Sequence, residues 1–128
     1  MLEKGILYQS HTTVTTSNTA AVMGSGDLPV FATPAMVALM EHAAMNVAAP
    51  HLPEGSTTVG AEMNVAHIKP SAIGMKITAT AELIKVEGRK LTFQVNARDM
   101  EGLVGQGTHV RYVVDRQKFM VKLGGNVI

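Results

Sequence analysis

The sequence predicts an α+β fold in which one antiparallel sheet of five strands curves around a single helix. Only one long segment, residues 34–49, has the composition of a helix. Strand patterns lie on both sides of it, and those that follow it are joined by short connections, which favour antiparallel pairing. A single antiparallel sheet must cover its apolar face, and this helix is the only element available to do so.

The first strand is expected within residues 5–16. This segment begins with Ile6, Leu7 and Tyr8 and continues into a threonine-rich run. Threonine favours the pleated, half-exposed backbone of a sheet. Residues 17–32 contain two glycines and a proline, which predicts a loop with at most a short helix.

The helix itself is predicted over residues 34–49. Thr33 is a favourable N-cap because its hydroxyl can accept a hydrogen bond from the first turn, and Pro34 suits the first helical position. Pro50 closes the segment. Its only polar side chains are Glu41, His42 and Asn46. A helix that is apolar on nearly every side belongs in the interior of a protein.

Four further strands are predicted after the helix. In the first of them, residues 57–69, His67 falls on the same face as Met63 and Val65, whereas strict alternation puts Gly60 on the opposite face. The other three strands are predicted over residues 75–87, 89–98 and 103–114.

Composition predicts one domain over residues 1–128 that associates with copies of itself. Apolar residues make up 46% of the chain, and charged residues make up 16%, against a usual value of about 25%. Because so few polar groups are available to cover a lone monomer, we expect a buried interface with one or more copies of the chain. After Asp115, Phe119 and Val121 are compatible with a last edge strand or an interface arm.

The same composition excludes several classes of protein. Without cysteine there is no disulfide framework, thiolate metal site or cysteine nucleophile. A net charge of +1, three Phe, two Tyr and no Trp lack the signals of nucleic-acid binding. No run approaches the roughly 18 apolar residues of a membrane span. The first residues lack the apolar block of a secretory signal, so we expect a cytoplasmic protein.

Glu41 is the first candidate for chemistry. Its neighbours on a helical wheel are all apolar, whereas His42 and Asn46 form a separate polar stripe. Desolvation of a carboxyl group raises its pKa and makes it a better base. An equally weighted alternative is that Glu41 only widens the polar stripe or pairs with a Lys or Arg.

His67 and Thr33 are further candidates. His67 lies on the strand face expected to pack against the helix that carries Glu41, where an imidazole could polarise a water or donate to an oxyanion. A lone His on an apolar face is, however, more often a hydrogen-bonded core residue. Thr33 is first of all a helix cap, although a hydroxyl beside the N–H groups of a helix start could also bind a carbonyl oxygen.

Several motifs resemble one enzyme family. Residues 30–41 (VFATPAMVALME) resemble the helix start of hotdog-fold thioesterases of the fluoroacetyl-CoA thioesterase type. Residues 78–83 (TATAEL), 86–91 (VEGRKL) and 105–111 (GQGTHVR) also look like that family. The resemblance covers most of the chain between residues 30 and 114.

This resemblance implies a fold, an activity and a set of site residues. The fold is a five-stranded antiparallel sheet around a central helix, assembled as a homodimer with active sites between subunits. The activity is hydrolysis of an acyl-CoA to a free acid and coenzyme A, for which no metal or redox cofactor is needed. Thr33, Glu41 and His67 occupy the catalytic positions, and Gly60 and Arg111 are implied to lie near the acyl group.

One departure from the family bears on the substrate. In the fluoroacetyl-specific enzyme a lid with two Phe residues precedes the catalytic Thr, whereas residues 22–29 contain none. We therefore expect a different or broader set of short acyl groups. Two alternatives stay open. A non-catalytic module would bind acyl-CoA and gain stability without turnover, and an enoyl-CoA hydratase would need an Asp and a His placed for water addition.

Overall fold

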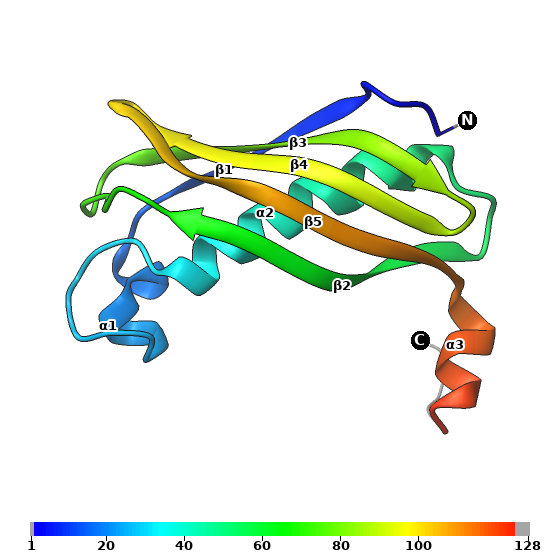
Figure 1. Ribbon diagram of the computed structural model, residues 1–128. Coiled ribbons are helices and arrows are strands. Elements are labelled where there is room, and N and C mark those ends of the chain that lie inside the picture. The colour runs from blue at the N-terminus through cyan, green and yellow to red at the C-terminus, as the bar shows by residue number, and fades with distance from the viewer. Residues whose placement is uncertain (1, 125–128) are drawn as a thin grey trace.

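A five-stranded antiparallel sheet lies across one long helix in the computed structural model, which describes residues 2–124 (Figure 1). Residue 1 and residues 125–128, which the predicted domain includes, lie outside the described residues. The strands are β1 (Leu7–Thr13), β2 (Ser56–His67), β3 (Lys76–Glu87), β4 (Lys90–Asp99) and β5 (Gly102–Asp115). The helices are α1 (Ala20–Met23), α2 (Thr33–Ala48) and α3 (Arg116–Lys122), with 3-10 turns η1 (Thr16–Asn18) and η2 (Ala49–His51).

The strand order is β1-β3-β4-β5-β2, and each neighbouring pair is antiparallel. The predicted α+β fold class, with one sheet around one helix, is therefore confirmed. β2 forms an edge of the sheet, and within the described residues no strand pairs with its outer side. An exposed edge carries unpaired N–H and C=O groups that another strand can satisfy.

The core lies between the sheet and the buried face of α2. Met36, Met40 and Val47 of the helix are fully or almost fully buried against Leu83 and Phe93 of the sheet. Burial of each such large apolar side chain contributes roughly 1.5–3 kcal/mol. The apolar helix α2 thus covers the apolar face of the sheet, as predicted.

The start of α2 differs from the prediction by one residue. Ala32 is the N-cap, and no side chain caps the helix; Thr33 is already helical, and Pro34 is the next residue. The Ala32 N–H donates to the carbonyl of Asn18, so the loop holds Ala32 at the turn into the helix. Pro is tolerated throughout a first turn because no donor is needed there. The Thr33 hydroxyl is therefore not a cap.

A β-bulge in β2 changes which side chains face α2. The pairing of β2 with β5 shifts between Gly60 and Glu62, which leaves Ala61 as an extra residue. One extra residue reverses the alternation of faces. Gly60 therefore faces α2, as His67 does, and the predicted placement of Gly60 on the opposite face is wrong.

The chain continues after β5 into α3. The Asp115 side chain accepts a hydrogen bond from the backbone N–H of Lys118 and caps this helix. The predicted edge strand at Phe119 and Val121 is therefore wrong, whereas an interface arm stays a prediction. α3 projects beyond the β2 edge of the sheet (Figure 1). None of the helices in residues 2–124 is long and apolar enough to cross a membrane.

Candidate active site

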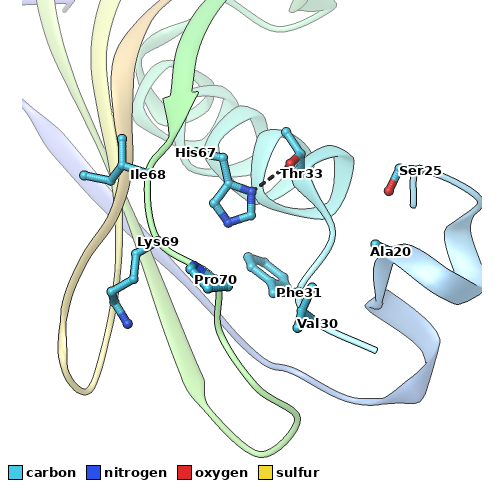
Figure 2. A pocket seen from close by; sticks show the side chains of 9 residues that line it. All are labelled: Ala20, Ser25, Val30, Phe31, Thr33, His67, Ile68, Lys69 and Pro70. Atoms are coloured by element: carbon cyan, nitrogen blue, oxygen red, sulfur yellow. Dashed lines mark hydrogen bonds between the residues drawn. The ribbon is translucent and has the colours of Figure 1, made fainter. Parts of the chain in front are cut away.

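The first part of the site lies where α2 begins. Thr33 Oγ1 is 2.7 Å from Nδ1 of His67, the last residue of β2 (Figure 2). The His67 and Phe31 rings also pack edge to face. Nε2 of His67 is buried and has no hydrogen-bond partner among the described residues. Because buried polar atoms are nearly always paired, this nitrogen is a candidate contact for a bound molecule.

A hollow of about 290 Å³ adjoins this pair. Its other lining side chains come largely from the segment that precedes α2, and include Ala20, Ser25 and Phe31. The Lys69 side chain points away from the His67 ring (Figure 2). Ligand pockets range from about 300 to 1,000 Å³, so a hollow of this size suits a small group.

The environment of His67 sets its charge. Burial lowers the pKa of His67, and the backbone of Lys69 partly opposes this. His67 is therefore neutral at pH 7, with a proton on one ring nitrogen. If the Thr33 hydroxyl donates to Nδ1, then Nε2 carries the proton and is a donor. In the other tautomer Nε2 is an acceptor.

The second part of the site is centred on Glu41, about 12 Å farther along the helix axis than Thr33. Glu41 Oε2 lies 3.7 Å from Nη1 of Arg111. The carboxylate occupies space that the absence of a side chain at Gly60 leaves open, because a Cβ there would be 2.6 Å from Oε2. The Glu41 side chain is 41% exposed. Within a single chain Glu41 therefore pairs with an arginine, which was the alternative interpretation of this residue. The single chain does not shield its carboxylate from water.

Arg111, on β5, is held by the neighbouring strand β2. Its Nε donates to Oγ1 of Thr58 over 2.8 Å, and its Nη2 donates to the carbonyl of Thr58 over 3.0 Å. Burial lowers the pKa of Arg111, and the charge of Glu41 opposes this. A buried guanidinium needs a nearby anion, and Glu41 is placed to supply it.

His109 completes the second part, and the sequence reasoning missed it. Its ring is buried, with Nδ1 2.7 Å from the carbonyl of Glu62 and Nε2 3.2 Å from Nη1 of Arg111. The signal that could have found it is the strand period. Residues two apart on a strand share a face, so His109 had to lie beside Arg111.

The two parts are separate within one chain. Gly60 and His67 lie seven residues apart on β2, which corresponds to about 20 Å. No hydrogen bond or ion pair among the described residues joins Glu41 to His67. Neither part gathers three His, Asp or Glu side chains, and no such metal-binding group occurs in residues 2–124.

Comparisons with known proteins agree with one another. Residues 14–117 match the family described as fluoroacetyl-CoA-specific thioesterase. A fluoroacetyl-CoA thioesterase of Streptantibioticus cattleyicolor is 43% identical over 94 residues, which cover 73% of this chain and 68% of that protein. A solved structure of a fluoroacetyl-CoA thioesterase superposes with a TM-score of 0.90 at 34% identity, over 97% of this chain and 96% of that chain. A thioesterase superfamily member from Thermus thermophilus has a TM-score of 0.90 at 27% identity, over 97% and 92% of the two chains.

Proposed function

Because the chain belongs to the fluoroacetyl-CoA-specific thioesterase family, has the hotdog fold and is a thioester hydrolase, we propose that it hydrolyses short acyl-CoA thioesters to a free acid and coenzyme A. The observation that carries this proposal is the position of the Glu41 carboxylate. It lies against Gly60, on the edge strand that ends in His67. The reacting group and the Thr33–His67 pair thus share one open edge of the sheet.

A homodimer paired through β2 would bring the two parts of the site together. An edge strand related to its own copy by a two-fold axis pairs antiparallel to it. Each end of β2 then lies beside the opposite end of the partner strand. Glu41 of one chain approaches His67 of the partner subunit, and the dimer contains two equivalent sites. The scarcity of charged residues supports such an interface.

The bulge restricts the register of this pairing. Directly opposed residues of an antiparallel pair point to the same face, so residues that face the helix must oppose one another. A two-fold axis at Asn64 meets this condition when the pairing skips the bulged Ala61, and it places Gly60 opposite the partner's His67. Paired strands lie about 4.8 Å apart. The Glu41 carboxylate at Gly60 is then next to the partner's imidazole.

This arrangement supplies the chemistry of thioester hydrolysis. Glu41 either attacks the carbonyl carbon or activates a water molecule that does so. The carbon–sulfur bond then breaks, and Nε2 of the partner's His67 gives a proton to the departing thiolate. Thr33 of the partner subunit orients that ring through its hydrogen bond to Nδ1. Where Glu41 itself attacks, the acyl group is left on it as a mixed anhydride, which water then hydrolyses to the free acid and the Glu41 carboxylate. Backbone N–H groups at the start of α2, or that of Gly60, stabilise the developing oxyanion.

The hollow beside His67 receives the acyl group in this proposal. Its size suits a short acyl chain, and Ser25 is the residue of the 22–29 segment that lines it. The segment contains no Phe, so we propose a broader or different acyl range than fluoroacetyl alone.

The experiment is a thiol-release assay of Glu41→Gln with a panel of short, branched, aromatic and halogenated acyl-CoAs. We expect kcat to fall by about three orders of magnitude, because loss of a positioned acid–base group costs roughly 10²–10⁴-fold. His42→Gln is the matched control. His42 is the next residue of α2 but contacts Ser10 and Asn46 instead, so its kcat should stay within about twofold. An unchanged kcat in Glu41→Gln would remove Glu41 from the mechanism.

A further inference from the structure

We propose that His109 is a positioning residue, which holds the Arg111 guanidinium against the Glu41 carboxylate and so keeps that carboxylate at Gly60. The inference rests on the proposed function for the role of Glu41. The hydrogen bonds of His109 do not depend on it. His109 itself makes no polar contact with Glu41 among the described residues, so it acts through Arg111.

The partners of His109 determine its tautomer. Nδ1 is 2.7 Å from the carbonyl of Glu62, and a carbonyl can only accept, so Nδ1 must carry a proton. Nε2 is 3.2 Å from Nη1 of Arg111, and a guanidinium can only donate, so Nε2 must be bare. His109 is therefore neutral and is an acceptor toward Arg111. Burial and the neighbouring Arg111 lower the pKa of His109, which supports this neutral form.

The hydrogen bonds of Arg111 explain why this acceptor matters. Nε and Nη2 are both held by Thr58, on the side of the guanidinium turned toward β2. Nη1 is the nitrogen nearest Glu41, at 3.7 Å, and its hydrogen bond to His109 fixes it from another side. Without that acceptor, one N–H of a buried guanidinium would lose its partner. The guanidinium would then tilt, and the carboxylate would shift with it.

His109 also ties this contact to the bulge. The carbonyl that receives Nδ1–H belongs to Glu62, directly after the extra residue of β2. The same bulge turns Gly60 toward α2. The His109 imidazole thus connects the bulged backbone of β2, where Gly60 leaves space for the Glu41 carboxylate, to Arg111. Arg111 is the cation that pairs with that carboxylate. A purely structural role is the competing interpretation, since the ring also packs against Phe93.

Two substitutions separate these roles. The amide of an asparagine reaches the position of Nδ1, whereas that of a glutamine reaches the position of Nε2. His109→Asn can donate to the Glu62 carbonyl but offers Arg111 no acceptor. His109→Gln offers Arg111 an acceptor but gives up the bond to Glu62. Both remove the same ring, and the two replacement side chains differ by one methylene group.

The assay is thiol release by both variants. Positioning predicts that His109→Asn loses roughly ten- to a hundredfold in kcat, with KM changed less than about threefold, because a small displacement of a reacting group costs this much. His109→Gln should keep most of the rate. The proposal is overturned if His109→Asn is the more active variant, if both lose the same factor, or if neither loses activity.

A second measurement needs no variant and no turnover. ¹⁵N NMR of the unsubstituted protein should show His109 as the neutral Nδ1–H tautomer at pH 7; a proton on Nε2 would contradict the proposal even if both variants fail to fold. The NMR measurement also separates the proposed role of His109 from the proposed role of Glu41. If Glu41→Gln keeps full activity, Glu41 is removed from the mechanism and the rates of the two His109 variants no longer report on positioning, while the tautomer still decides whether His109 is an acceptor toward Arg111.

Discussion

Gly60 determines where the carboxylate of Glu41 can lie. A Cβ at this position would be 2.6 Å from Glu41 Oε2 and 3.3 Å from Nη1 of Arg111. The Glu41 carboxylate is the end of a flexible, partly exposed side chain and can move aside at little cost to the fold, whereas Nη1 needs to shift by only a few tenths of an ångström. The glycine is therefore required for the position of the charged pair more than for stability.

Gly60→Ala should accordingly separate activity from stability. We expect kcat to fall by roughly tenfold or more, because the carboxylate is displaced from its position, while thermal stability changes little. Gly107 on β5 provides the contrast. A Cβ there would overlap the carbonyl oxygen of Asn64 and Cα of Val65, which are backbone atoms that cannot move aside, so Gly107→Ala should cost about 3 kcal/mol in unfolding free energy. Equal losses of stability in the two variants would contradict this account.

Residue types and periods predicted most of the individual candidates. Glu41 stood out because its neighbours on the helix are apolar, and His67 because it shares a strand face with apolar residues. Their partners were not predictable in this way. A helical wheel or a strand alternation gives the direction of a side chain but not its height along the element, so the pairing of Glu41 with Arg111, and the link from Arg111 to His109, required the strand register.

At the scale of elements, Asp99 holds the turn between β4 and β5. Its buried carboxylate accepts hydrogen bonds from the Lys69 ammonium, from the Ser71 hydroxyl at 2.8 Å, and from the backbone N–H groups of Glu101 and Gly102. Burial alone raises the pKa of Asp99. The hydrogen bonds and the charge of Lys69 outweigh burial and lower that pKa to about 2.

This network should make the fold sensitive to acid. Because the folded pKa of Asp99 lies below its unfolded value of 3.8, its stabilisation is complete above about pH 4 and is lost as the pH falls towards about 2. Asp99→Asn should lower the unfolding free energy at pH 7 by roughly 1 kcal/mol after allowance for solvent screening, and should flatten its decline between pH 4 and pH 2. Urea unfolding at several pH values measures both effects.

The control for this prediction is Glu87→Gln. Glu87 pairs with Lys85 over 3.6 Å, but both side chains are largely exposed. Exposed ion pairs contribute little, so the variant should keep the stability of the parent at pH 7. A decline between pH 4 and pH 2 as steep in Asp99→Asn as in the parent would show that Asp99 is not its cause.

Hydrophobic periodicity predicted the elements well where their patterns are strong, as in α2 and β4. It failed where a single residue changes the pattern. The bulge at Ala61 has no signal in composition, because it depends on the pairing of β2 with β5. The N-cap of α2 is Ala32 and not the predicted Thr33, because the Ala32 N–H is hydrogen-bonded to the backbone carbonyl of Asn18. α3 was missed because seven residues are too few for a helical period to stand out.

At the scale of the whole molecule, the two parts of the site point to an assembly. One chain places Thr33 with His67 and places Glu41 with Arg111, about 20 Å apart along β2. Composition had already predicted a subunit interface from the scarcity of charge. Composition does not indicate which surface would form that interface, whereas the strand order shows that β2 is an open edge.

Complementation between two inactive variants tests this central claim most directly. Glu41→Gln and His67→Ala are each expected to be inactive. In a mixed dimer, Glu41 of one chain meets His67 of the partner subunit at one site, and the other site carries both substitutions. Random reassembly of equal amounts, followed by a thiol-release assay, should restore about a quarter of the parent activity, because half of the dimers hold one intact site. A mixture no more active than either variant alone would contradict a site shared between two chains.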